Sequence, residues 1–169
     1  MTAAPPPAGA PVLHLFCGKI ASGKSTLARR LAAAPGRVLI CEDDWLARLY
    51  PGEIATLEDY ARCSRRLRGV MADHVTALLR SGLSVVLDAP ANTVGARQDL
   101  RRVFEAAGVA HRLHFLDLPD GLCKARLRQR NADGGHAFLP SEADYDRFTS
   151  LFHAPGAEEG FDLVVYPAR

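Results

Sequence analysis

The sequence predicts an α/β fold built around a parallel sheet. Short apolar runs alternate with amphipathic helical segments along the 169-residue chain, which is the pattern of βαβ units. The first apolar run ends directly in the glycine-rich segment 18–25, GKIASGKS, and a helical segment follows it. With 48% hydrophobic and 24% charged residues, the chain is apolar enough to bury a core and is about the size of one domain.

The first half of the chain predicts three strands and three helices in alternation. Residues 12–17 form a strand, and 24–34 form a helix that stops at Pro35 and Gly36. The next elements are a buried strand, an acidic turn and a short helix, at 38–41, 42–44 and 45–50. Thr56 and Asp59 resemble a capping box and open a helix to residue 80, before a strand at 83–87.

The second half continues the alternation. A helix at 94–107 ends before Gly108, and the following strand and helix are expected at 111–118 and 119–131. A glycine-bearing loop, a helix and a final strand complete the chain at 131–140, 141–152 and 161–166. Residues 1–11 are rich in Pro and Ala without apolar periodicity, so we expect a disordered leader before a single domain at 12–169.

Composition excludes several classes of protein. No run of apolar residues is long enough to span a membrane, and the leader lacks the pattern of a signal peptide, so we expect a cytoplasmic protein. The four cysteines lie far apart without metal-ligand spacing, as expected of reduced thiols. A net charge of +2 is well below that of a dedicated nucleic-acid binder. No obligate protein partner is evident.

The segment 18–25 matches GxxxxGK[ST], the phosphate-binding P-loop. Its glycines let backbone N–H groups surround a phosphate, Lys24 reaches the β- and γ-phosphate oxygens, and the Ser25 hydroxyl is an expected Mg²⁺ ligand. The alternative is a chance glycine turn, but the strand before it and the helix after it are the context that the motif requires. We therefore expect a nucleotide and Mg²⁺ to bind at Gly18, Lys19, Ile20, Ala21, Ser22, Gly23, Lys24, Ser25 and Thr26.

Three aspartates follow or end strands of the predicted sheet. Asp43 comes after the second strand, where a carboxylate, ionised at its usual pKa near 3.9, can act as general base toward an acceptor hydroxyl. The alternative is that Asp43 or Asp44 caps the following helix, and we assign capping to Asp44. Asp88 ends the third strand and is an expected ligand of Mg²⁺ or of its waters. Its alternative is a loop-starting residue before Pro90.

Arginines near the end of one helix form a second group of candidate site residues. Arg126 and Arg130 share a helix face and lead into the glycine-bearing loop, so we expect them to stabilise charge on a transferring phosphoryl group. A solvated helix end is the alternative. A second run of arginines either meets an anionic acceptor or faces water: Arg62, Arg65, Arg66 and Arg68.

These segments resemble the P-loop kinases that include the polynucleotide kinase domain, gluconate kinase, zeta toxins and chloramphenicol phosphotransferase. GKSTLARRLAAAPG through CEDDWL, then VVLDAPAN and LDLPDGLCKARLRQRN, carry the resemblance. It implies a three-layer fold with strand order 2-3-1-4-5, a lid at 131–140, catalytic roles for Lys24, Asp43, Arg126 and Arg130, and an acceptor-side Asn92. Leu46 departs from the polynucleotide kinases, which have a phosphate-contacting arginine there.

The sequence therefore predicts an ATP-dependent phosphotransferase. The expected reaction moves the γ-phosphoryl group of Mg-ATP to a hydroxyl of a small molecule, a metabolite or an antibiotic. The first alternative is a kinase of 5′-hydroxyl polynucleotide ends, and the second is an ATPase or nucleotide-dependent switch. The family resemblance, together with the absence of a guanine-specific NKxD motif, makes ATP the expected nucleotide.

Overall fold

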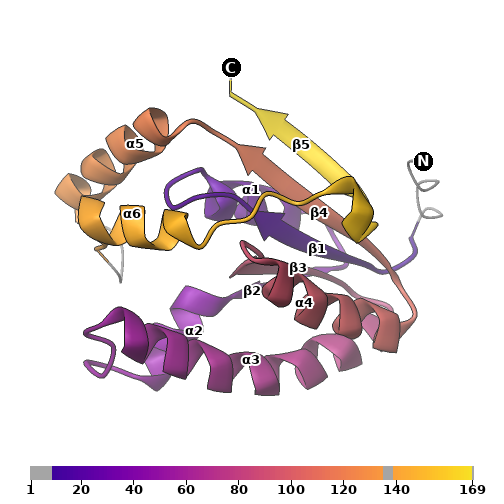
Figure 1. Cartoon of the computed structure of the whole chain (residues 1–169). Coiled ribbons are helices and arrows are strands. Elements are labelled where there is room, and N and C mark those ends of the chain that lie inside the picture. The colour runs from indigo at the N-terminus through magenta and orange to yellow at the C-terminus, as the bar shows by residue number, and fades with distance from the viewer. Residues whose placement is uncertain (1–8, 135–138, 169) are drawn as a thin grey trace.

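The computed structural model describes residues 9–134 and 139–168 and has five strands in one parallel sheet. The order is β2-β3-β1-β4-β5, as the family resemblance implied. The strands are β1 (Val12–Cys17), β2 (Arg37–Cys41), β3 (Ser84–Pro90), β4 (Ala110–Asp117) and β5 (Leu163–Pro167). Figure 1 shows β1 in the middle of the sheet, between β3 and β4.

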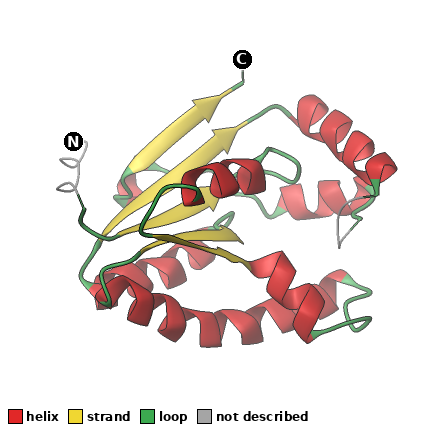
Figure 2. Cartoon of the chain, turned by 180° about the vertical axis from the view of Figure 1, so that it is seen from behind, coloured by secondary structure: helices red, strands yellow, loops and turns green. Residues whose placement is uncertain are grey.

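Helices cover both faces of the sheet and form a three-layer α/β fold. Figures 1 and 2 show α3 and α4 together on one face, with α1 on the other. Helices α5 and α6 pack against each other beyond the end of β4. The helices are α1 (Lys24–Ala32), α2 (Glu42–Leu49), α3 (Leu57–Arg80), α4 (Val94–Ala107), α5 (Asp120–Asp133), α6 (Glu142–Ser150) and the short 3-10 helix η1 (Ala157–Glu159).

The main core lies between the sheet and the pair α3 and α4. Side chains from β1, β3 and β4 meet one face of α3, whose buried positions recur at helical spacing: Cys63, Leu67, Met71, Val75 and Leu79. A smaller cluster around Phe16 and Leu27 lies under α1. Parallel strands buried on both faces explain why the strand sequences are nearly continuous apolar runs.

Helix boundaries agree with the sequence to within a few residues, with one exception. The expected turn at 42–44 is wrong, because α2 begins at Glu42 and carries its acidic residues in its first turn, where they complement the helix dipole. The assignment of Asp44 as the cap is also wrong, since Cys41 occupies the N-cap position. The capping box of Thr56 and Asp59 is confirmed, with both reciprocal hydrogen bonds present.

An ion pair between a fully buried arginine and a largely buried glutamate fastens the C-terminal segment to α4. Arg97 is 0% exposed, and its Nε and Nη2 donate to the two carboxylate oxygens of Glu159 at 2.6 and 2.8 Å. The remaining Nη1 donates to the carbonyl oxygens of Ala91 and His153 at 3.0 and 2.8 Å. This guanidinium therefore joins α4, the end of β3 and the chain that leads into β5.

Two histidines lie inside the sheet layer on neighbouring strands. His14 Nδ1 is 3.0 Å from His114 Nε2, and His114 Nδ1 is 3.0 Å from the Tyr166 hydroxyl. Burial, reinforced by nearby charges, lowers the pKa of each histidine to about 4. Both rings are therefore neutral at pH 7 and contribute to packing. Across the described residues, no helix combines the length and apolar character that crossing a membrane requires.

Candidate active site

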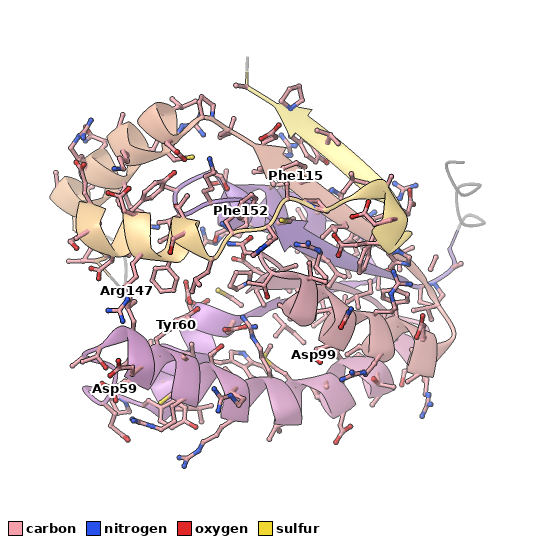
Figure 3. The ribbon with its side chains drawn as sticks, viewed as in Figure 1. Asp59, Tyr60, Asp99, Phe115, Arg147 and Phe152 are labelled. Atoms are coloured by element: carbon pink, nitrogen blue, oxygen red, sulfur yellow. The ribbon has the colours of Figure 1, made fainter. Side chains whose placement is uncertain are left out.

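A cleft of about 1910 Å³ opens at the carboxyl ends of the strands. Its walls come from the loop after β1, from α2, α3 and α4, and from α5 and α6. In Figure 3, Arg147 extends from α6 toward the end of α3 that carries Asp59 and Tyr60. The edge of the Phe148 ring of α6 lies against the Tyr60 ring, with centroids 6.1 Å apart. Ligands of open α/β sheets bind at such a crevice.

The loop 18–25 has the backbone shape of a phosphate cradle. Gly18 has φ of 153°, and a Cβ there would meet Ser22 Oγ at 2.7 Å and the Leu116 carbonyl oxygen at 3.0 Å. Gly23 also has a positive φ, 102°, at the N-cap of α1. Asn92, expected on the acceptor side, uses its Oδ1 to accept from the Gly18 N–H at 2.9 Å. Asn92, two residues after the end of β3, therefore holds the loop after β1.

Lys24 folds back over this loop. Its ammonium donates to the carbonyl oxygens of Gly18 and Lys19 at 2.6 and 2.8 Å. Burial lowers the pKa of Lys24, while the carboxylates of Asp88 and Asp43 oppose that effect. The Ser22 hydroxyl is buried and has no hydrogen-bond partner within the described parts of the chain. A half-buried ammonium and an unsatisfied hydroxyl in a turned-in loop fit a bound phosphate.

The other loop residues divide between the cleft and the neighbouring helix α5. Ala21, Ser25 and Thr26 line the cleft, as do Ile20 and Lys19. The ammonium of Lys19 forms a 2.5 Å ion pair with Asp120 at the start of α5, and the Tyr145 hydroxyl donates to the same carboxylate at 2.9 Å. The phosphate loop is thereby connected to both α5 and α6.

Asp43 lies in the first turn of α2 and lines the cleft. Burial raises the pKa of Asp43 to about 6, with further increases from the nearby charges of Glu42 and Asp88. The Tyr60 hydroxyl, 3.4 Å from Asp43 Oδ1, and the Lys24 ammonium lower it in part. The expectation of an unperturbed carboxylate is therefore wrong. A pKa near 6 still leaves Asp43 mostly ionised at pH 7 and makes it a stronger base.

Asp88 lies inside β3, two residues before its end, so the prediction that the strand stops before Asp88 is wrong. Its side chain is 9% exposed, lines the cleft and accepts a weak hydrogen bond from the Cys41 thiol at 3.7 Å. Ser25 lines the same cleft. A carboxylate and a hydroxyl are hard oxygen donors, the kind that Mg²⁺ prefers. The two predicted metal-binding residues therefore fit this ion.

Arg126 and Arg130 both line the cleft, whereas Arg128 lies on another face and pairs with Glu142 at 2.6 Å. Arg126 Nη1 is 3.4 Å from the Ser22 carbonyl oxygen of the loop. Arg130 Nε is buried and unpaired among the residues that the structure describes. Burial lowers the pKa of Arg130, and the Asp43 carboxylate opposes this. Of the expected lid at 131–140, residues 135–138 lie outside the described residues.

The arginines expected on α3 have different surroundings. Arg62 is exposed and pairs with Asp59 one turn earlier, whereas Arg65 lines the cleft. Arg68 binds Glu42, a fully buried carboxylate for which the sequence predicts no role. A signal for a buried polar partner was present in the sequence. It is the pair Ser64 and Arg68, two polar residues one turn apart beside the apolar stripe of α3.

A turned-in glycine loop between β1 and α1, in a parallel sheet of this order, defines the P-loop kinase fold. The chain belongs to the AAA_33 family, described as an AAA domain, which it matches over residues 13–155. Comparison with curated proteins finds no match.

Solved structures share the fold. A candidate kinase from Chloroflexus aurantiacus aligns with a TM-score of 0.74 and 19% identity over 94% of this chain and 85% of that one. The Mycobacterium tuberculosis APS kinase CysC, solved with AMPPNP and APS, aligns with a TM-score of 0.59 and 23% identity. The alignment covers 94% of this chain and 88% of that one. A chain of the Pnkp1/Rnl/Hen1 RNA repair complex aligns with a TM-score of 0.63 and 23% identity. The alignment covers 83% of this chain and 44% of that one.

Proposed function

We propose that residues 12–169 form one kinase domain, which transfers the γ-phosphoryl group of Mg-ATP to a hydroxyl of a small molecule. The observation that carries the proposal is the Asp43 carboxylate. Its pKa is about 6, and it lines the same cleft as Lys24 and Ser25 of the P-loop. A cleft that combines a phosphate cradle with a carboxylate base suits transfer to an alcohol.

In the proposed reaction, the loop N–H groups and Lys24 hold the β- and γ-phosphates, while Arg126 and Arg130 stabilise charge on the transferring group. The acceptor oxygen bonds to the γ-phosphorus as the bond to the ADP oxygen breaks. The hydroxyl proton passes to the Asp43 carboxylate. Ser25 and Asp88 would hold Mg²⁺, which neutralises charge on the phosphate oxygens when bound.

Two observations favour a small acceptor over a polynucleotide. Leu46, which replaces a phosphate-contacting arginine of the polynucleotide kinases, is 0% exposed and packs in the main core. The cleft walls on α3 and α4 mix charges of both signs: Arg65, Asp73, Asp99 and Arg102. A strand of nucleic acid is expected to need a continuous basic surface.

The test is transfer of label from γ-labelled Mg-ATP to a panel of acceptors. The panel holds sugars, nucleosides, aminoglycoside- and chloramphenicol-type antibiotics, and a 5′-hydroxyl oligonucleotide. We expect label on a small molecule, abolished in Lys24→Ala. Label only on the oligonucleotide, with steep salt dependence, would replace this proposal with a polynucleotide kinase. Hydrolysis that no acceptor affects would replace it with an ATPase or switch.

A further inference from the structure

A hydrogen-bond network around a buried carboxylate lies beside the proposed base. Glu42, the residue before Asp43, is 0% exposed. Its Oε1 accepts from the Ser64 hydroxyl at 2.5 Å and from Arg68 Nη2 at 3.0 Å, and its Oε2 accepts from Arg68 Nε at 2.8 Å. The pair is bidentate, which fixes the orientation of both groups as well as their distance. The first turn of α2 is thereby attached to the middle of α3.

Tyr60 connects this network to the cleft. Its hydroxyl is 3.5 Å from Glu42 Oε1 and 3.4 Å from Asp43 Oδ1. Both distances are longer than a usual O–H···O bond, so the hydroxyl lies between two carboxylates and can turn toward either. The Tyr60 ring meets Phe148 of α6 edge-on. One side chain of α3 thus contacts the first turn of α2 and the helix on the opposite wall.

The local sequence gives α2 little stability of its own. The helix has eight residues and its N-cap, Cys41, makes no side-chain capping hydrogen bond. Helices this short are marginal without tertiary contacts. Successive residues point about 100° apart around a helix axis, since 3.6 residues make a turn. Glu42 can therefore face α3 while Asp43 faces the cleft, and the Glu42 contacts fix the backbone from which Asp43 projects.

We propose that Glu42, Arg68 and Tyr60 are positioning residues for Asp43: the Glu42–Arg68 pair fixes the first turn of α2 on α3, and the Tyr60 hydroxyl orients the Asp43 carboxylate. The role of Asp43 rests on the proposed function. Glu42 is fully buried and the Arg68 side chain is 36% exposed, and an ion pair with a desolvated partner adds little net stability compared with apolar packing. The contribution of the Glu42–Arg68 pair is its fixed geometry, because Glu42 is the residue next to Asp43.

The charges around Asp43 give this network a measurable signature. The Glu42 charge raises the pKa of Asp43, and the Tyr60 hydroxyl lowers it. The other charged groups that act on Asp43 are Asp88 of β3 and Lys24 of α1, and Arg130 of α5 interacts with its charge. Removing Glu42's charge and removing Tyr60's hydroxyl should therefore shift the same carboxylate in opposite directions. A role limited to packing would not give opposite shifts.

The experiment compares Tyr60→Phe, Glu42→Gln and Arg68→Met with the wild type, using metal-free protein for titration and Mg-ATP for activity. The control is Arg62→Met, which breaks the ion pair of the exposed Arg62 with Asp59 on the same helix. The Asp43 carboxyl is titrated by ¹³C NMR. We expect its midpoint to rise in Tyr60→Phe, to fall in Glu42→Gln and to stay unchanged in the control.

Phosphoryl transfer to the acceptor found in the panel is measured in parallel. We expect kcat to fall about 10-fold in Tyr60→Phe and about 10²-fold in Arg68→Met, with KM for ATP within twofold of the wild type. Arg68→Lys should recover part of kcat, because a lysine keeps the charge but cannot pair bidentately.

Unchanged NMR midpoints in both Tyr60→Phe and Glu42→Gln, or shifts in the same direction, would overturn the proposal. So would a wild-type kcat in Tyr60→Phe, which leaves the Glu42–Arg68 pair intact. If the wild type transfers no label to any acceptor, the proposed function fails instead. The NMR arm still decides whether the network acts on the Asp43 carboxyl.

Discussion

Replacing Glu159 with Gln should cost the protein about 3 kcal/mol of stability. The substitution leaves the fully buried Arg97 guanidinium beside a neutral amide, which offers one acceptor oxygen where the carboxylate accepts at 2.6 and 2.8 Å. Breaking a buried pair by removing one partner typically costs about 3–5 kcal/mol. Glu159 is 13% exposed and Arg97 keeps two carbonyl acceptors, so the lower end applies.

Urea denaturation at pH 7 measures this loss, and the melting temperature should fall by about 6–12 °C for a chain of this size. The control is Glu105→Gln, which removes the exposed partner of Arg101 and should change stability by less than about 0.5 kcal/mol. Hydrogen bonds from Arg97 lower the pKa of Glu159. Its contribution is therefore complete above about pH 4.3, the usual value for Glu, and is lost as pH falls through the lowered pKa. Equal losses in the two variants would refute the reasoning.

Three further predictions concern the site and the sheet. Asp43→Asn should lower kcat about 10²- to 10⁴-fold, and wild-type activity should fall as pH drops below about 6, where Asp43 becomes protonated, as steady-state rates between pH 5 and 8 can check. Gly18→Ala should weaken ATP binding in calorimetry at least 10-fold, because the new Cβ would press on the Leu116 carbonyl oxygen at 3.0 Å. Stability should decline as pH falls from about 6.5 toward 4. In this range His14 and His114 bind protons in the unfolded chain but stay neutral in the folded protein, where their pKa is about 4. A urea series over this range should show a shallower decline in His14→Asn, and an unchanged slope would contradict the assignment.

Local patterns were sufficient to predict most elements of the fold. The P-loop with its flanking strand and helix, the capping box of Thr56 and the glycine that ends α4 each depend on residues within a few positions of one another. The strand order came from the family resemblance, which spans nearly the whole chain. The start of α2 was mispredicted because three acidic residues suit both a turn and the first turn of a helix.

Long-range partners could not be predicted from the same patterns. Glu42 looks like a surface acid in the sequence, and only its burial against Arg68, 26 positions away, distinguishes it from Asp44. Arg97 is a further example, since an arginine on an amphipathic helix is normally solvated and its partner is 62 positions away. The raised pKa of Asp43 depends on residues from four separate elements. Such properties arise only when the elements pack together.

The central place of β1 also affects how the chain acquires its fold during synthesis. β1 leaves the ribosome before the other four strands that the structure describes, yet Val12 pairs with Ala110, roughly 100 residues later. Proteins dominated by such distant pairings fold slowly. Until β4 emerges, β1 presents an apolar, unpaired edge, which is a template for association with other chains. A nascent chain that stalls within α4 would have no native partner for that edge, so expression at high rates should be limited by aggregation before release.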